Sequence, residues 1–260
     1  MSNQSAKRLV LGFKVLKKVP AVLRPLTDHV VACYRRHHAD LQSVFVIGSV
    51  AVGEWTEGVS DVDVVGVVDH AFTTEDEDPR RHELTELGKS FPQVSFINNS
   101  TLSLEALQEK NPDAMSIDRA RIIAVTGLLV SGQKLDFHDY LPTVEAMAYG
   151  RAARAKILMG RYRLGIINEP FRSNPKLLAR SCAKAAIRVL SGITILRGAI
   201  FYASPHKTAA MVTRYAPEAV PLAYRALAIV DGAVSEPNEA MGIAEQAVEM
   251  FYELYPEPLA

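Results

Sequence analysis

Two aspartates, Asp61 and Asp63, stand on either side of one valine at the start of an apolar run. Residues at i and i+2 of a strand point to the same face, so the two carboxylates would lie side by side. Their charges repel each other, and burial strengthens that repulsion. A divalent cation removes the difficulty, because Mg²⁺ takes carboxylate oxygens as ligands. The pair therefore predicts a magnesium site on a strand whose other face, with Val62 and Val64, is turned to a core.

A Gly-Ser pair, Gly48 and Ser49, ends the apolar segment that precedes these aspartates. A glycine at the end of a strand lets the backbone approach a phosphate, and the serine hydroxyl and nearby N–H groups can bind phosphate oxygens. Each signal is weak by itself, since Asp-x-Asp is common and Gly-Ser is often only a turn. Placed between two apolar strands, the turn and the acidic pair together favour a nucleotide phosphate site.

The elements that position these residues divide the chain into two halves. The hydrophobic pattern predicts an α+β protein, with a mixed sheet flanked by helices over residues 1–140 and an all-α helical domain over residues 141–260. In the first half we expect strands at 43–48, 61–68, 93–97 and 127–132, and helices at 21–40, 75–91, 103–110 and 117–125. In the second half we expect helices at 144–167, 175–200, 207–214, 219–231 and 236–255.

The composition favours a soluble cytoplasmic protein. The chain has 260 residues, of which 48% are hydrophobic, and its 29 basic and 29 acidic residues balance, so net charge indicates no partner. The two cysteines, Cys33 and Cys182, argue against a disulfide scaffold and fit a reducing compartment. No apolar run approaches the roughly 20 residues of a membrane helix. The N-terminus lacks the apolar stretch and cleavage site of a secretory signal.

Charge is uneven along the chain. Residues 61–86 contain nine acids against two arginines, and residues 151–200 contain eleven Lys and Arg against one acid, Glu169. An acidic half could hold a cation and a basic half could hold phosphates; equally, the two surfaces could pair with each other.

Four cations recur at every fourth residue of the helix expected at 175–200 and form one ridge. Because like charges repel, such a row favours an anionic partner, although a solvated helix face is the simpler interpretation. Aromatic residues do not alternate with the cations, so nucleic acid stays open as a partner without support from the sequence. The four are Lys176, Arg180, Lys184 and Arg188.

The segments VFVIGS and SDVDVVGVV resemble the pattern of the DNA polymerase beta superfamily of nucleotidyltransferases, over roughly the first half of the chain. The resemblance implies a mixed sheet with flanking helices, two Mg²⁺ ions, and ATP or another nucleoside triphosphate as donor. An acceptor oxygen would attack the α-phosphate and expel pyrophosphate. By this resemblance Asp61 and Asp63 are the catalytic, metal-binding residues, and Gly48 and Ser49 hold the triphosphate.

The family usually places a third acid on a later strand, and the segment QVSFI offers Ser95 instead, followed by two asparagines. A serine supplies neither a charged metal ligand nor an efficient base at neutral pH. Three explanations stay open. Glu105 could be the missing acid, Glu54 or Glu57 could be the base, or the site could bind a nucleotide without turning it over.

A second, looser resemblance lies in GAIFYASPHKTAA, residues 198–210. It is similar to a segment in the helical domain of bacterial aminoglycoside adenylyltransferases of the streptomycin/spectinomycin type, whose lysine reaches the nucleotide phosphates. The match implies that Lys207 binds phosphate, with Lys184 and Arg188 as further candidates.

We therefore expect a nucleotidyltransferase that moves AMP from ATP-Mg to an acceptor hydroxyl. The sequence does not identify the acceptor: an aminoglycoside, a protein side chain and an RNA end all stay open. It also leaves the oligomeric state undetermined. The alternative is a non-catalytic nucleotide-binding or antitoxin-like protein on the same fold, because Ser95 stands where an acid is expected.

Overall fold

The computed structural model describes residues 9–256 apart from residues 59, 73, 111, 168 and 234–235, and only the backbone of helix residues 74–78, 114–115 and 169–170. The chain forms two compact units. We call Phe13–Leu141 the sheet unit, and Pro142–Ala260 with the described residues 9–12 the helical unit. The expected division into 1–140 and 141–260 stays a prediction; it differs from these units in two respects, because residues 9–12 group with the helices and Leu141 groups with the sheet.

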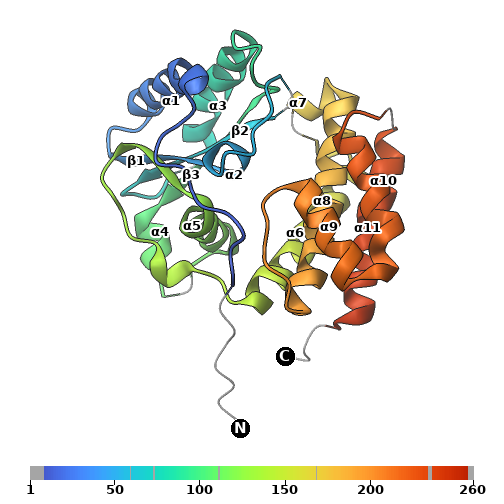
Figure 1. Ribbon diagram of the computed structural model, residues 1–260. Helices are drawn as coiled ribbons and strands as arrows, with labels where there is room; N and C mark the ends of the chain where they lie inside the picture. Colours follow the sequence, from blue (N-terminus) through green and yellow to red (C-terminus); the bar gives the residue numbers. More distant parts are fainter. Residues whose placement is uncertain are drawn as a thin grey trace. The chain divides into compact units, whose positions relative to one another are not determined.

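The sheet unit contains one mixed sheet with the strand order β3-β2-β1-β4 (Figure 1). β1 is antiparallel to both β2 and β4, whereas β2 and β3 run parallel. The strand expected at 93–97 is wrong, because only its last residue, Ile97, belongs to a strand. The strands are β1 (Leu41–Ile47), β2 (Val62–Val68), β3 (Ile97–Ser103) and β4 (Leu128–Gly132).

Helices cover both faces of this sheet (Figure 1). One core joins α1 and α3 to the strands through residues such as Leu26, Leu84 and Val46. A second core joins α4 and α5 to the other face through Leu107, Ile123 and others. Successive strand residues alternate between the two cores, as a strand's period of two requires. The helices are α1 (Arg24–His37), α2 (Gly48–Ala51), α3 (Thr74–Lys89), α4 (Leu104–Gln108) and α5 (Ala114–Thr126), with short 3₁₀ turns at Ala21–Leu23 and His138–Tyr140.

Buried polar groups between α1, α3 and the sheet fix the position of β3. Tyr34, which is fully buried, packs over Gly66, where any Cβ would overlap its ring. The Tyr34 hydroxyl donates to the carbonyl oxygen of Ser100 (2.6 Å), and the buried Arg80 donates to Asn99 Oδ1 (2.9 Å) while its guanidinium lies 4.4 Å from the Tyr34 ring centroid. These partners pair with the Asn99 side chain and one carbonyl oxygen of β3, and so help to hold the polar segment INNSTLS as an edge strand.

The helical unit is arranged around α8, which contacts α6, α9, α10 and α11. Gly192 on α8 lies against the backbone of Ala148 on α6, so the two helices approach closely there. The helix expected from residue 175 begins there, whereas α9 begins at Pro205, two residues before the helix expected at 207–214; the Asn174 and Ser204 side chains cap the two helices. The helices are α6 (Val144–Arg163), α7 (Glu169–Arg172), α8 (Pro175–Leu196), α9 (Pro205–Tyr215), α10 (Val220–Val230) and α11 (Pro237–Leu254), with a 3₁₀ turn at Pro217–Ala219.

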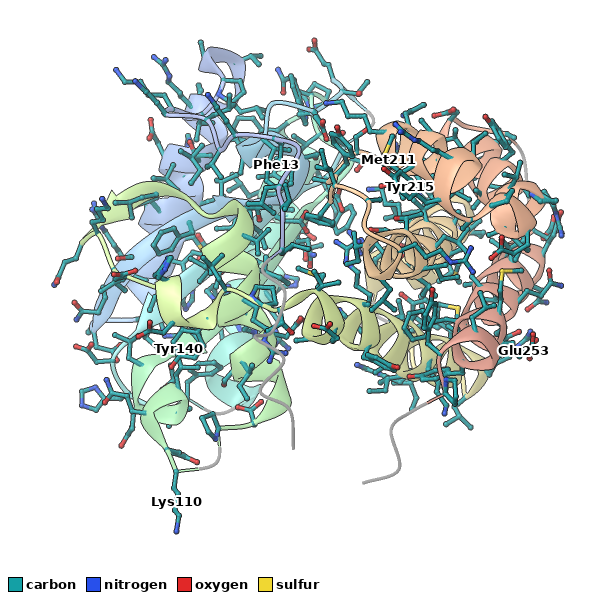
Figure 2. The ribbon with its side chains drawn as sticks, turned by 60° about the horizontal axis from the view of Figure 1, so that its bottom comes forward. Phe13, Lys110, Tyr140, Met211, Tyr215 and Glu253 are labelled. Atoms are coloured by element: carbon teal, nitrogen blue, oxygen red, sulfur yellow. The ribbon has the colours of Figure 1, made fainter. Side chains whose placement is uncertain are left out.

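The segment at residues 9–12 joins this unit through the loop that leads into α9. Leu11 and Phe201 form a parallel bridge, and the N–H of Gly12 donates to the carbonyl oxygen of Phe201 (2.8 Å). In Figure 2, Met211 and Tyr215 mark α9, and Glu253 marks the end of α11. Among the described residues, none of the helices is both long enough and apolar enough to cross a membrane.

Candidate functional site

The Gly-Ser turn and the acidic strand meet at one end of the sheet. Ile47, the last residue of β1, is paired with Asp63 on β2. The next residue, Gly48, has φ of +69°, and a Cβ built on it would lie 2.7 Å from Asp63 Oδ2. A larger residue would therefore be strained and would also displace the carboxylate. Glycine is what lets the backbone turn lie against the acid.

The alternation expected for the acidic strand is confirmed. Val62 and Val64 are buried, with 0% and 1% of their surface exposed, whereas Asp61 and Asp63 are half-buried. Asp61 comes directly before β2. The aspartates thus have the sequence parity of Val65, which belongs to the core on the α4 and α5 side of the sheet.

The third strand supplies an amide beside the acids. Asn98 is paired with Asp63 in the parallel register, and its Nδ2 donates to Asp63 Oδ1 (2.7 Å). Ser95, which the sequence analysis placed in this position, is exposed and precedes β3, with its N–H donating to the carbonyl oxygen of Ser60 (3.0 Å). The assignment of Ser95 is therefore corrected to Asn98. The sequence analysis noted the asparagines but placed the strand too early.

Two alternatives for the third acid lie in different places. The carboxylate of Glu105 accepts from the N–H of Ala71 (2.9 Å) at the opposite end of β2, about 17 Å of strand away from Asp63. Glu105 is therefore excluded as a ligand shared with Asp63. Glu54 is half-buried, and its N–H donates to the carbonyl oxygen of Ser49 (2.9 Å), which holds it beside the turn. Glu57 is exposed.

Thr126, at the C-terminal end of α5, is a site residue that the sequence analysis missed. The N–H of Gly48 donates to Thr126 Oγ1 (3.3 Å), and that hydroxyl donates to the carbonyl oxygen of Ile122 (3.1 Å). The contact connects the turn to the helix behind it. A threonine at the end of a helix carries no local signal for such a role, because its partner is 78 residues away in the sequence.

The donor set at this end of the sheet fits a magnesium ion. Two carboxylates and a neighbouring side-chain amide are hard oxygen donors, which Mg²⁺ prefers, and the glycine turn leaves the backbone close to them. Among the described residues, no third carboxylate joins Asp61 and Asp63. The one group of three metal-ligating side chains found among them lies at another place in the fold. The residues that would hold the ion are Asp61 and Asp63.

The predicted phosphate-binding cations belong to the helical unit. Lys207 is exposed in the first turn of α9, where its N–H donates to the capping Ser204 hydroxyl (3.4 Å), and its Nζ lies 5.6 Å from the centroid of the Tyr202 ring. On α8, Lys184 is half-buried and Arg188 is exposed. Their role in binding phosphate stays a prediction.

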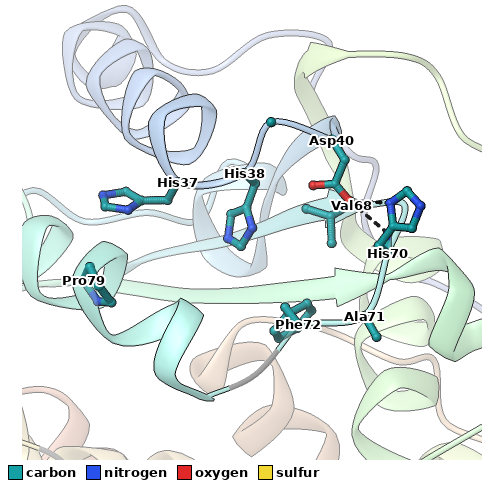
Figure 3. A pocket seen from close by; sticks show the side chains of 9 residues that line it. His37, His38, Asp40, Val68, His70, Ala71, Phe72 and Pro79 are labelled. Atoms are coloured by element: carbon teal, nitrogen blue, oxygen red, sulfur yellow. Dashed lines mark hydrogen bonds and ion pairs between the residues drawn. The ribbon is translucent and has the colours of Figure 1, made fainter.

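A pocket of about 520 Å³ lies at the opposite end of β2 (Figure 3). Asp40, at its rim, accepts from the backbone N–H (2.9 Å) and from ring Nδ1 (3.3 Å) of His70. Burial raises the pKa of Asp40, but the hydrogen bonds from His70 outweigh it and hold that pKa below its usual value. The other described residues that line the pocket are His37, His38, Ala39, Val68, Ala71, Phe72 and Pro79.

Comparisons with known proteins agree with this geometry. The family model described as "Nucleotidyltransferase domain" matches residues 32–113. The solved structure of spectinomycin adenyltransferase AAD(9) from Enterococcus faecialis with ATP and spectinomycin aligns with a TM-score of 0.54 and 13% identity, over 86% of this chain and 98% of that one. This similarity shows a common fold.

A second solved structure, a mutant of the toxin-antitoxin MntA-HpeT, aligns over 53% of this chain and 93% of that one, with 11% identity. Its TM-score of 0.30 is too low to indicate a common fold. Curated protein sequences contain no significant match to the chain.

The matched range contains the glycine turn, the acidic pair and the asparagine that pairs with it. The structure that surrounds them is an α+β fold with a mixed sheet and a helical C-terminal part. Residues 32–113 of this chain are therefore a nucleotidyltransferase domain.

Proposed function

We propose that this protein transfers AMP from ATP to a hydroxyl group of an acceptor molecule, in a reaction that depends on Mg²⁺. The observation that carries the proposal is the contact between Gly48 and Asp63, where a Cβ would lie 2.7 Å from the carboxylate. A turn by itself does not require a carboxylate against its glycine backbone. A site for a metal-bound phosphate requires both, because the acid binds the metal and the backbone approaches the phosphate.

In this proposal Asp61 and Asp63 bind the metal from one face of β2. The amide of Asn98 holds Asp63 by donating to Oδ1, so the outer oxygen, Oδ2, stays against the Gly48 turn. The backbone and hydroxyl of Ser49 approach the phosphates, and Lys207 neutralises phosphate charge, with Lys184 and Arg188 as further candidates. When bound, Mg²⁺ supplies charge neutralisation for the triphosphate and lowers the pKa of an attacking oxygen.

The acceptor's proton needs a base. Glu54 is the candidate that the fold holds next to the turn, through the hydrogen bond of its N–H to the Ser49 carbonyl oxygen. Its side chain is half-buried, and a carboxylate held at the site can accept a proton. Glu57, which is exposed, is the weaker candidate.

The solved structure with a similar fold suggests which donor and acceptor to test first. Since the Enterococcus faecialis enzyme was solved with ATP and spectinomycin, these two molecules are the first pair to test. A protein hydroxyl and an RNA end are the next acceptors. We expect the reaction to take place in the cytoplasm, where ATP and Mg²⁺ are both abundant.

The test measures binding before chemistry. Calorimetry with ATP and Mg²⁺ gives the affinity, and a pyrophosphate-release assay with each acceptor then gives the activity. We expect Asp61→Asn to abolish Mg²⁺-dependent ATP binding and the matched Asp69→Asn, at the other end of β2, to preserve it. Unchanged binding in Asp61→Asn would refute the metal role.

Lys207 has a matched control on the same unit. Lys156 on α6 also lies over a tyrosine ring, with its Nζ 5.3 Å from the centroid of Tyr252. We expect Lys207→Ala to weaken ATP binding by about tenfold, the effect of losing one strong charge contact, and Lys156→Ala to leave it unchanged. Equal effects of the two variants would remove Lys207 from the proposed site.

A second function is favoured by one observation, the amide of Asn98 at the place beside Asp63. An amide carries no charge and cannot take a proton, so a site with two acids could bind ATP-Mg without transferring AMP. Such a protein would act as a nucleotide sensor or an antitoxin-like partner. Tight, Mg²⁺-dependent ATP binding with no pyrophosphate release for any acceptor would support it.

A further inference from the structure

Three side chains with metal-binding atoms converge between α1 and α3, on the face of the sheet that carries Tyr34. They are Cys33 and His37, one turn apart on α1, and Glu83 on α3, and their ligand atoms all lie within 4.8 Å of one another. Residues at i and i+4 share a helix face, so the cysteine and the histidine are brought together by the helix itself. The tertiary packing of α3 adds the carboxylate.

The cluster brings one sulfur, one nitrogen and one oxygen donor atom close to one another. His37 Nε2 is 2.9 Å from Glu83 Oε2, and Arg36 binds the second carboxylate oxygen, Oε1. The Cys33 thiol is fully buried, and it lies 4.0 Å from the carbonyl oxygen of Arg80. The histidine and glutamate side chains are 24% and 38% exposed, so an ion could enter from that side.

We propose that Cys33, His37 and Glu83 bind a Zn²⁺ ion. Zinc takes sulfur, nitrogen and oxygen ligands at about 2.0–2.3 Å, which places neighbouring ligand atoms roughly 3.3–3.8 Å apart around a tetrahedron. The present separations of up to 4.8 Å need only small side-chain rotations to reach that arrangement. A mixed sulfur, nitrogen and oxygen set selects zinc over Mg²⁺, which prefers oxygen alone.

The surroundings supply what a zinc site needs beyond its ligands. Arg36 stays on Oε1 of Glu83 and orients the carboxylate, so that Oε2 faces the ion. Water takes the fourth position on the exposed side. The bound ion would fasten α1 to α3, the two helices that cover one face of the sheet.

The other free cysteine is a natural control. Burial raises the pKa of both thiols, Cys33 and Cys182, to about 12, and a nearby glutamate contributes in each case. Zinc is bound by the thiolate, so its binding at Cys33 would release the thiol proton. Among the described residues only Cys33 belongs to a group of three metal-ligating side chains.

The test is cobalt substitution in the full-length protein after removal of metals with a chelator. Co²⁺ bound to a thiolate gives a charge-transfer absorption band, and a tetrahedral site also gives visible bands. We expect both in the native chain, with one Co²⁺ per protein, and their loss when one equivalent of Zn²⁺ is added. We also expect Zn²⁺ to raise the melting temperature, because the folded state brings its three ligands together and binds it more tightly than the unfolded chain.

Variants separate the site from other causes. Cys33→Ser should lose the charge-transfer band, whereas Cys182→Ser should keep it. His37→Gln, which changes a partly exposed side chain and leaves the buried thiol in place, should weaken Co²⁺ binding by at least about tenfold. Circular dichroism checks that each variant is folded. If Cys33→Ser does not fold, the Co²⁺ affinity of His37→Gln tests the zinc site in its place.

The proposal is independent of nucleotide transfer. Asp63→Asn, which removes a proposed Mg²⁺ ligand, should keep the cobalt–thiolate band, because the two sites share no residue. The absence of that band in the native chain, or its persistence in Cys33→Ser, would overturn the zinc site while leaving the proposed function untouched.

Discussion

The two ends of β2 both carry acids, but their acids have different partners. At the far end, Asp69 accepts from the Gln42 side chain (2.5 Å), and Asp40 accepts from His70 (Figure 3). At the near end, Asp63 lies between the amide of Asn98 and the backbone of the glycine turn. A carboxylate that caps backbone N–H groups stabilises the fold, whereas carboxylates gathered beside a bare turn suit a cation and its ligand. The type of residue is thus the same at both ends, and we propose that the difference in surroundings gives the acids different roles.

The largest expected effect comes from replacing one aspartate by asparagine at each end of β2. Asp63→Asn removes a proposed metal ligand and should reduce Mg²⁺-dependent AMP transfer by about 10²-fold or more, since metal ligation contributes several kcal/mol to transition-state binding. Asp69→Asn should leave the rate unchanged. The comparison fails if both substitutions reduce pyrophosphate release equally.

The turn gives the next largest effect. Gly48→Ala would combine left-handed backbone strain of about 1–2 kcal/mol with displacement of the Asp63 carboxylate, so we expect a loss of stability and a loss of ATP affinity of about 10-fold or more. Gly165→Ala is the matched control, because Gly165 has φ of +71° and nothing within 4 Å of an added Cβ.

Both glycine variants should lose stability in a denaturant titration, and Gly48→Ala should lose at least as much as Gly165→Ala. Only Gly48→Ala should also lose ATP binding in calorimetry. If Gly165→Ala weakened ATP binding as much, backbone strain alone would account for the effect, and the turn would have no special role.

The near end can also be made more acidic. Asn98→Asp would place a third carboxylate beside Asp63, remove the amide donor to Oδ1 and increase the negative charge that a cation neutralises. We expect Mg²⁺ affinity to rise about fivefold, close to 1 kcal/mol, and the apo protein to be less stable. Calorimetry with Mg²⁺ and ATP measures the first, and pyrophosphate release shows whether the variant transfers AMP faster.

Asn98→Ala separates charge from contact in the same experiment. It removes the hydrogen bond to Asp63 without adding charge, and it should not raise Mg²⁺ affinity. If Mg²⁺ affinity rose in both variants, the gain would come from removing the amide and not from the added charge.

The smallest effect is expected at the far end. The pKa of Asp40 is lowered below 3.8 in the folded protein, so the stability that it contributes is fully present above that value and is lost as pH falls through the folded pKa. Asp40→Asn should cost less than about 1 kcal/mol at pH 7, because the pair with His70 is partly exposed. The gap between the native and variant unfolding free energies should narrow below pH 3.8.

The exposed Asp28 on α1 supplies the control for pH. Asp28→Asn should change the unfolding free energy by less than Asp40→Asn at pH 7. A gap for Asp40→Asn that stayed constant down to pH 2 would contradict the structural role of the pair with His70.

The sequence by itself determined the features that depend on neighbours along the chain. The i and i+2 spacing placed Asp61 and Asp63 on one face, the buried valines confirmed the opposite face, and the helix expected from residue 175 begins at Pro175. These are properties of local geometry, since strand and helix periods are fixed by the backbone. Residues 32–113, which match a nucleotidyltransferase domain, contain this acidic pair.

Only the tertiary structure decided which residue stands beside the acids. The polar segment that follows Phe96 gives no apolar strand signal, yet buried Arg80 and Tyr34 supply hydrogen-bond partners for it, and the parallel register then brings Asn98, not Ser95, to Asp63. Partners of this kind lie tens of residues away in the sequence, so no pattern within a strand can reveal them. The cluster of Cys33, His37 and Glu83 has the same origin, because the helix supplies two of its members and only packing supplies the third.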